Sequence, residues 1–159
     1  MKRAKLDAID LQILAALQEN GRITNVDLSE RVGISAPPCL RRVRALEEAG
    51  FIQGYHADLN VKALGFEVTV FAMVGLHSQA EADLQAFEKL VGTWPLVREC
   101  HMLNGDIDFI LKCVAPDLST FQSFLTGLLT PAPNVASVRT SLTIRQSKHQ
   151  PGVPLEALG

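Results

Sequence analysis

The first helix is predicted from apolar side chains that recur at helical spacing near the start of the chain. One helix face is formed by Leu6, Ile9, Ile13, Leu14 and Leu17. Asp7 and Asp10 stand near the beginning of this pattern, where the helix dipole favours acidic side chains. Asn20 and Gly21 follow it and favour its end.

A second, shorter helix is predicted after this break. Thr24 precedes Asp27 by three positions, which is the spacing of a capping box at a helix start. Leu28 and Val32 are expected to face inward, and Gly33 is expected to end the helix.

A third helix follows at once, and it carries the most distinctive pattern in the chain. Ser35 is a favourable N-cap, and Pro37 and Pro38 fall in the first turn, where a missing amide hydrogen loses no helical bond. Gly50 is expected at its C-cap. The predicted inward face consists of Leu40, Val43 and Leu46.

The opposite face of this helix is basic. It is centred on Arg41 and Ala45, and its flanks are formed by Pro37, Pro38, Arg42 and Arg44. Two short helices, a turn with glycine and a basic helix are typical of a helix-turn-helix, and arginine suits contacts to guanine edges and phosphates. A solvated basic face is the alternative. Cys39 leans toward the apolar side, which favours a packed core thiol over a redox switch.

The remaining two thirds alternate between strand and helix patterns. Ser78 and Glu81 suggest a capping box, and Asn104-Gly105-Asp106 is a strong hairpin signal. The second of the two helices is expected to bury Leu118, Phe121, Leu125 and Leu128. The predicted elements are a strand at 68–76, a helix to about residue 91, strands at 97–103 and 108–114, a helix from 116–117, and a strand at 135–144.

This order is β-α-β-β-α-β, so the predicted fold is α+β, with a winged helix-turn-helix followed by a ferredoxin-like domain. We expect a first domain at 1–60, a second at 61–148 and a tail at 149–159. Residues 51–60 form either a short β wing or the link between domains. Two helices cover only one face of the sheet, so the other apolar face is expected to pack against a second subunit.

Charge and cysteine content narrow the classes of function. The net charge is −2, and residues 1–60 hold eight basic and eight acidic residues, so a nucleic-acid signal must come from local placement. Three cysteines without a CxxC motif indicate no disulfide framework or zinc module and fit a reducing cytosol. The sequence also suggests no signal peptide and no membrane span.

Few residues suggest small-molecule chemistry. Asp106 and Asp108 could bind a primary amine, and nearby backbone amides could bind a carboxylate, which together describe an α-amino acid. Ordinary turn chemistry is the alternative for these acids. The histidines are scattered and no nucleophile–base arrangement stands out, so neither a catalytic nor a metal site is predicted.

At this point the sequence resembles the Lrp/AsnC, or feast/famine, family of regulators, closest to its leucine-responsive branch. The resemblance spans about Leu6 to Lys148 and rests on three segments, LDAIDLQILAALQENGRITNVDLSERVGIS, PPCLRRVRALEEAGFIQGY and ECHMLNGDIDFILKCVAPDLSTF. It implies a DNA-binding domain, an amino-acid-binding domain, and dimers that assemble into octamers or similar rings. The DNA-binding set that we expect is Ser35, Pro37, Pro38, Arg41, Arg42 and Arg44.

The resemblance also implies where the effector binds. In the family it lies between dimers, near a Gly-Asp-x-Asp turn that matches Gly105, Asp106 and Asp108 here. Two departures stand out, since Phe109 replaces a usual tyrosine and TPAPNV replaces a Leu-Pro-Gly-Val form. The full expected effector set is Met102, Gly105, Asp106, Asp108, Leu118, Leu142 and Thr143.

The predicted function is therefore a cytoplasmic, sequence-specific transcriptional regulator of amino-acid metabolism genes. A small amino acid is expected to modulate its assembly or its binding to double-stranded DNA, with no other cofactor. The alternative is an enzyme that decarboxylates a haem precursor on the same two-domain frame. The basic helix and the lack of a histidine pair argue against that alternative.

Overall fold

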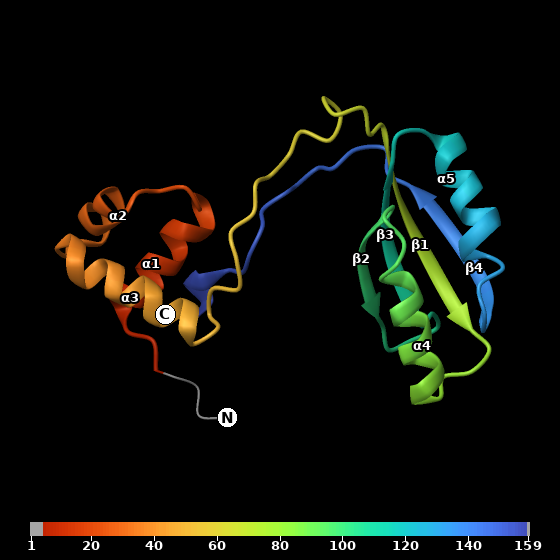
Figure 1. The fold of residues 1–159 in the computed structure, drawn as a ribbon, viewed down its shortest axis with the longest axis horizontal. Helices are drawn as coiled ribbons and strands as arrows, with labels where there is room; N and C mark the ends of the chain where they lie inside the picture. The colour runs from red at the N-terminus through yellow and green to blue at the C-terminus, as the bar shows by residue number, and fades with distance from the viewer. Residues whose placement is uncertain (1–4, 159) are drawn as a thin grey trace. The chain divides into compact units, whose positions relative to one another are not determined.

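The computed structural model describes residues 5–158, and Figure 1 traces them. Residues 1–4 and 159, at the outer ends of the expected first domain and tail, lie outside the described residues. Contacts within the chain define two compact units. The first unit contains the residues up to Asp58 together with those from Lys148 onward, and the second unit is Leu59–Ser147.

The first unit contains three α-helices, α1 (Ala8–Glu19), α2 (Asn25–Val32) and α3 (Ala36–Glu48), and a short 3-10 helix at Leu155–Leu158 near the end of the chain. The start of α1 is a reciprocal capping box, in which Asp7 accepts from the backbone of Asp10 and Asp10 accepts from the backbone of Asp7. Thr24 caps α2 as predicted, and Gly33 ends it in the left-handed conformation with φ 72°. These local signals set the boundaries of the helices.

The core of the first unit brings the inner faces of the three helices together. Its buried members are Ile13, Ala16, Leu28, Val32, Cys39 and Leu46. Cys39 is fully buried, which confirms the core thiol, and burial raises its pKa. The prediction that Leu40 faces inward is wrong, because the buried stripe of α3 is centred on Cys39, and Leu40 remains 38% exposed.

The two ends of α3 differ in detail from the prediction. Ser35 stands at the N-cap position, but its side chain makes no capping hydrogen bond, and the two prolines fill the first turn instead. The C-cap is Ala49, and Gly50 follows it with φ 77°. Residues 53–60 form no strand, so in this structure they are a link and not a β wing.

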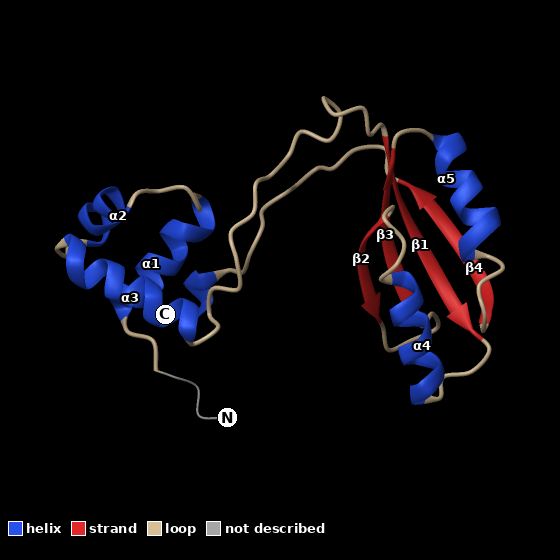
Figure 2. Ribbon diagram, in the orientation of Figure 1, coloured by secondary structure: helices blue, strands red, loops and turns tan. Residues whose placement is uncertain are grey.

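The second unit is a four-stranded antiparallel sheet with two helices (Figure 2). The strand order is β2-β3-β1-β4, which confirms the ferredoxin-like α+β fold. Its elements are β1 (Val68–Leu76), α4 (Glu81–Val91), β2 (Val97–Met102), β3 (Phe109–Ala115), α5 (Leu118–Phe124) and β4 (Val135–Leu142).

One face of the sheet is packed and the other is not. Every second residue of β1 and β3 is buried against α4 and α5, where Phe87 contacts Phe109 and Trp94. On the opposite face, Phe71 is 36% exposed although it lies in the middle of β1. A period of two therefore divides β1 into a core face and an open face.

Two predicted helix details in the second unit are wrong. Ser78 does not cap α4, because the helix begins later, with Ala80 at the N-cap, and the Ser78 hydroxyl lies 2.5 Å from a carboxylate oxygen of Asp83. Leu118 and Leu128 are also not buried, being 45% and 51% exposed. A π-helical turn at Leu125–Leu129 continues α5 and shifts the inward position from Leu128 to Leu129.

No helix among residues 5–158 is long and apolar enough to cross a membrane.

Asn134 offers a direct test of how the start of β4 is held. It has φ 68°, and its side chain both accepts from the Ser78 amide and donates to the Ser78 carbonyl at 2.8 Å. We predict that Asn134→Gly, which keeps the left-handed backbone but loses both hydrogen bonds, lowers the free energy of unfolding by about 2 kcal/mol. Asn134→Ala should lose about 1 kcal/mol more because of backbone strain. Denaturant unfolding measures both, and equal values for the two variants would contradict the strain.

Candidate nucleic-acid interface and effector site

The basic surface of α3 is smaller than the sequence suggests. Arg41 and Arg44 are exposed and make no ion pair within residues 5–158. Pro37 is exposed beside them, Pro38 is half-buried, and Ser35 is exposed at the start of the helix. The outward arginines are therefore Arg41 and Arg44.

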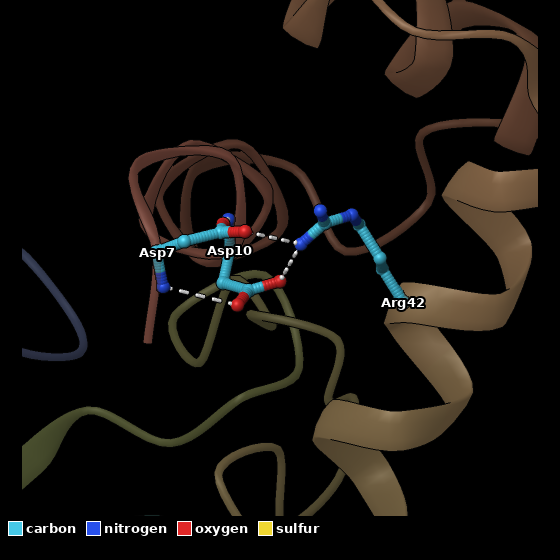
Figure 3. Close-up of polar contacts among 3 residues, drawn as sticks. All are labelled: Asp7, Asp10 and Arg42. Atoms are coloured by element: carbon cyan, nitrogen blue, oxygen red, sulfur yellow. Dashed lines mark hydrogen bonds and ion pairs between the residues drawn. The ribbon is translucent and has the colours of Figure 1, made fainter. Parts of the chain in front are cut away.

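Arg42 lies differently, because it forms ion pairs within the first unit (Figure 3). Its Nη1 atom donates to Asp7 Oδ2 and to Asp10 Oδ1, both at 2.8 Å. The two carboxylates are the pair that forms the capping box of α1. A single guanidinium group thus ties the middle of α3 to the first turn of α1.

The charged groups of this cluster stabilise one another's ionised forms. The Asp10 amide, and then the Arg42 guanidinium, hold the pKa of Asp7 below its usual range. Hydrogen bonds to Asp10 and Asp7 raise the pKa of Arg42. Both shifts favour the charged forms, so the contact holds across neutral pH. The sequence reasoning noted Asp7 and Asp10 only as dipole partners and missed their link to α3.

In the second unit, Asp108 fixes the hairpin to the end of β1. Its Oδ2 accepts from the Leu76 amide at 2.6 Å and from Gln79 Nε2 at 3.4 Å. Its own amide donates to the Val74 carbonyl at 2.9 Å, and its carbonyl accepts from the Leu103 amide at 2.8 Å. Gln79 is a site residue that the sequence pattern did not indicate.

The adjacent turn is open to solvent. Gly105 has φ 152°, and Asp106 is exposed with no hydrogen bond or ion pair to the residues that the structure describes. Met102, which pairs with Phe109 across the hairpin, is 57% exposed. This edge therefore presents one unpaired carboxylate next to an exposed apolar side chain.

The other three predicted effector residues lie at the opposite end of the sheet. Leu142 pairs with Val70 and is 52% exposed, and the Thr143 amide donates to the Thr69 carbonyl at 2.8 Å. The Thr143 hydroxyl is buried without a partner. Leu118 starts α5 after β3 has ended, so it belongs to the same end.

The predicted set therefore falls into two clusters within one chain. The turn cluster contains Met102, Gly105, Asp106 and Asp108, and the β4 cluster contains Leu118, Leu142 and Thr143. Val74 pairs with Phe109 and Val70 with Leu142, and four residues of strand span about 13 Å. One small amino acid cannot contact both clusters of the same chain.

Other chemistry is not assembled in the described part of the chain. No group of three or more His, Cys, Asp or Glu side chains between residues 5 and 158 could hold a metal ion. Burial raises the pKa of Cys100 and of Cys113 to about 11, so both thiols are poor nucleophiles at neutral pH.

Two sequence profiles match the two halves of this arrangement. One, described as winged helix-turn-helix DNA-binding, matches residues 6–53. The other, described as the Lrp/AsnC ligand binding domain, matches residues 69–153. They assign DNA binding to the helical unit and ligand binding to the sheet.

Several bacterial regulators are similar to this chain along most of their length. The leucine-responsive regulatory protein of Rhizobium meliloti (strain 1021) is 60% identical over 146 residues, which cover 92% of this chain and 94% of the relative. That of Escherichia coli (strain K12) is 43% identical over 143 residues, covering 90% and 87%. The Bkd operon transcriptional regulator of Pseudomonas aeruginosa is 41% identical over 152 residues, covering 96% and 99%. These relatives are regulators and not enzymes, as the sequence predicted.

Solved structures of transcriptional regulators share the fold of this chain. A transcriptional regulator of Neisseria meningitidis, crystallised as an L-Met complex, has a TM-score of 0.92 and 36% identity, with coverage of 97% of this chain and 99% of that one. An AsnC family transcriptional regulator from Agrobacterium tumefaciens has a TM-score of 0.90 and 30% identity, with coverage of 96% and 99%. The chain, with its helix-turn-helix unit and its ligand-binding sheet, therefore belongs to the Lrp/AsnC family of transcriptional regulators.

Proposed function

We propose that this regulator binds specific DNA sequences through α3 and that an apolar amino acid, of the leucine or methionine class, modulates its binding or assembly. The names of its relatives, leucine-responsive regulatory proteins, and the L-Met complex of a structural relative support this effector class. The observation that carries the proposal is the separation of the predicted effector residues into two clusters, which supports an effector site shared between subunits. Regulation of amino-acid metabolism genes in the cytoplasm fits the same family.

For DNA, the exposed arginines are the main contacts. With α3 in the major groove, Arg41 and Arg44 reach base edges or phosphates, and Ser35 and Pro37 approach the backbone near the start of the helix. Arg42 keeps a place in the DNA-binding set by holding α3 at the correct angle to α1. Its charge is already shared with Asp7 and Asp10.

For the effector, the two clusters offer complementary chemistry. The free Asp106 carboxylate pairs with the α-ammonium group, while Asp108 keeps the turn in shape through Leu76 and Gln79. Exposed Met102 on one subunit, and Leu118 and Leu142 on another, cover the apolar side chain of the effector. The Thr143 hydroxyl is buried without a partner among residues 5–158, so it donates to the α-carboxylate once effector binding uncovers it.

Assembly follows from the same geometry. A pair of subunits covers the open sheet face, where Phe71 lies, and contacts between pairs bring the turn cluster of one chain to the β4 cluster of another. Dimers and a larger ring, such as an octamer, satisfy both needs. Several copies of a short, nearly neutral DNA-binding unit then act together on one site.

We predict that Arg41→Ala weakens binding to the target promoter by about tenfold or more, because a base-contacting arginine contributes about 1–3 kcal/mol. Its unfolding temperature should stay at the wild-type value, because Arg41 has no partner within residues 5–158. Fluorescence anisotropy at several salt concentrations, together with calorimetric unfolding, measures both. Unchanged affinity at every salt concentration would rule out Arg41 as a DNA contact.

Arg42→Ala is the matched variant one residue along the same helix. It should lower the unfolding temperature of the first unit as well as DNA affinity, because it breaks the link between α3 and α1. The pKa of Asp7 should rise only part of the way to its usual value, because the Asp10 amide remains as its largest stabilising contact. An NMR titration of the Asp7 carboxyl measures this, and an unmoved pKa would contradict the ion pair.

The two acids of the turn should behave differently. Asp106→Asn should weaken binding of leucine or methionine by about tenfold or more, since an ion pair with the ligand is lost, and should leave the unfolding temperature unchanged. Asp108→Asn should lower the unfolding temperature as well, because its carboxylate accepts from the Leu76 amide. Isothermal calorimetry and thermal unfolding separate the two. Full effector binding by Asp106→Asn would refute its role.

A further inference from the structure

An apolar groove in the first unit has no part in DNA or effector binding as described above. It has a volume of about 800 Å³, and its lining includes Leu11, Leu14 and Leu17 of α1 together with Phe51 and Tyr55. Val153, Leu155 and Leu158, from the C-terminal end of the chain, complete its lining. The groove is thus bordered by segments from both ends of the sequence.

The C-terminal segment is attached there by a specific contact. Gln18, exposed on α1, donates from Nε2 to the Val153 carbonyl at 2.8 Å and accepts through Oε1 from the Val153 amide at 2.9 Å. One side-chain amide satisfies both backbone groups of one residue, as a neighbouring β-strand would. Nearer the start of the segment, His149 Nε2 lies 3.3 Å from Asp58 Oδ2.

Residue 152 fits this attachment only as glycine. Its φ is +90°, and a Cβ atom there would lie 2.1 Å from Gln18 Oε1 and 2.6 Å from Gln18 Cγ. Both the backbone conformation and the close approach therefore require glycine. Gly152 in the C-terminal segment therefore allows the adjacent Val153 to form its hydrogen bonds with Gln18 of α1.

We propose that the C-terminal segment, residues 149–158, which forms one wall of this groove and is bound to α1 through Gln18, couples the effector site to the DNA-binding unit. The coupling rests on the proposed function. Thr143, in the β4 cluster, is tied to β1 through the Thr69 carbonyl, and only nine residues, 144–152, separate it from Val153. An effector that displaces the end of β4 thereby moves the segment that is hydrogen-bonded to Gln18 of α1. Helix α1 is in turn linked to α3 by Arg42.

The first test measures whether the segment is bound. In the full-length protein, Gln18→Ala should accelerate hydrogen exchange of the amides in residues 150–158 by about thirtyfold, since two hydrogen bonds of about 1 kcal/mol each are lost. Gln12→Ala, an exposed glutamine one and a half turns earlier on α1, is the matched control and should change nothing. Equal exchange in the two variants would overturn the binding site.

The second test asks whose segment occupies the groove. In the double variant Gln18→Cys, Gly152→Cys, the shorter residue 18 removes the Gln18 atoms that would clash with a Cβ atom at residue 152. The two cysteines lie close together, so they should form a disulfide under mild oxidation in spite of the strained φ of residue 152. A single-chain band on a non-reducing gel is expected, with Gly152→Cys alone as the control for bridges to native thiols. A disulfide-linked dimer would show that a second copy supplies the segment and would overturn the proposal.

The third test concerns coupling and uses leucine as the probe. Wild-type and Gln18→Ala proteins should bind promoter DNA within about twofold of one another without leucine, and Gln18→Ala should lose most of the change in affinity that leucine causes. A full leucine effect in Gln18→Ala with a released segment would overturn the coupling. If wild type responds to no amino acid, the proposed effector function fails, and the exchange experiment still decides on the binding site.

Discussion

The antiparallel pairing of β1 with both β3 and β4 constrains this molecule more than any other feature. Through β3, the C-terminal end of β1 holds the Gly105–Asp108 turn, and through β4, its N-terminal half holds Leu142. The rise of an extended strand then keeps the turn cluster and the β4 cluster apart by a distance greater than an amino acid can span. A binding site that uses both ends has to be built between subunits, and the proposed site would therefore make effector binding and assembly one equilibrium.

In the helical unit, too, a contact between elements distant in sequence positions a functional element. Three caps and a small core define its helices, and one guanidinium group shared between two carboxylates links α3 to the start of α1. The same carboxylates cap α1, so the loss of Arg42 disturbs both the helix start and the packing of the recognition helix. Arg41 and Arg44, which flank it in sequence, are exposed and make no ion pair within residues 5–158, and these are the arginines that we propose as DNA contacts.

Local chemistry made much of the fold predictable from the sequence. Caps at Thr24 and Gly33 and the glycine turn at 104–106 depend on neighbouring residues only, and they appear where expected. Leu128 was wrongly predicted to be buried because a π-helical turn shifts the inward positions after α5 by one residue. The spacing of apolar residues in the sequence does not reveal such a turn. The role of Arg42 was missed because its partners are 32 and 35 residues away in sequence, and the division of the effector set depends on strand register.

The central claim is that two chains complete one effector site, and mixed assemblies test it most directly. Asp106→Asn impairs the turn cluster and Leu142→Asp impairs the β4 cluster, so each variant alone should bind leucine about tenfold or more weakly than wild type in calorimetry. When the two are unfolded together and reassembled at equal ratio, about a quarter of the sites should combine intact clusters from different chains and regain binding. No recovery in the mixed assemblies, with wild type reassembled in parallel as the control, would contradict a site shared between subunits.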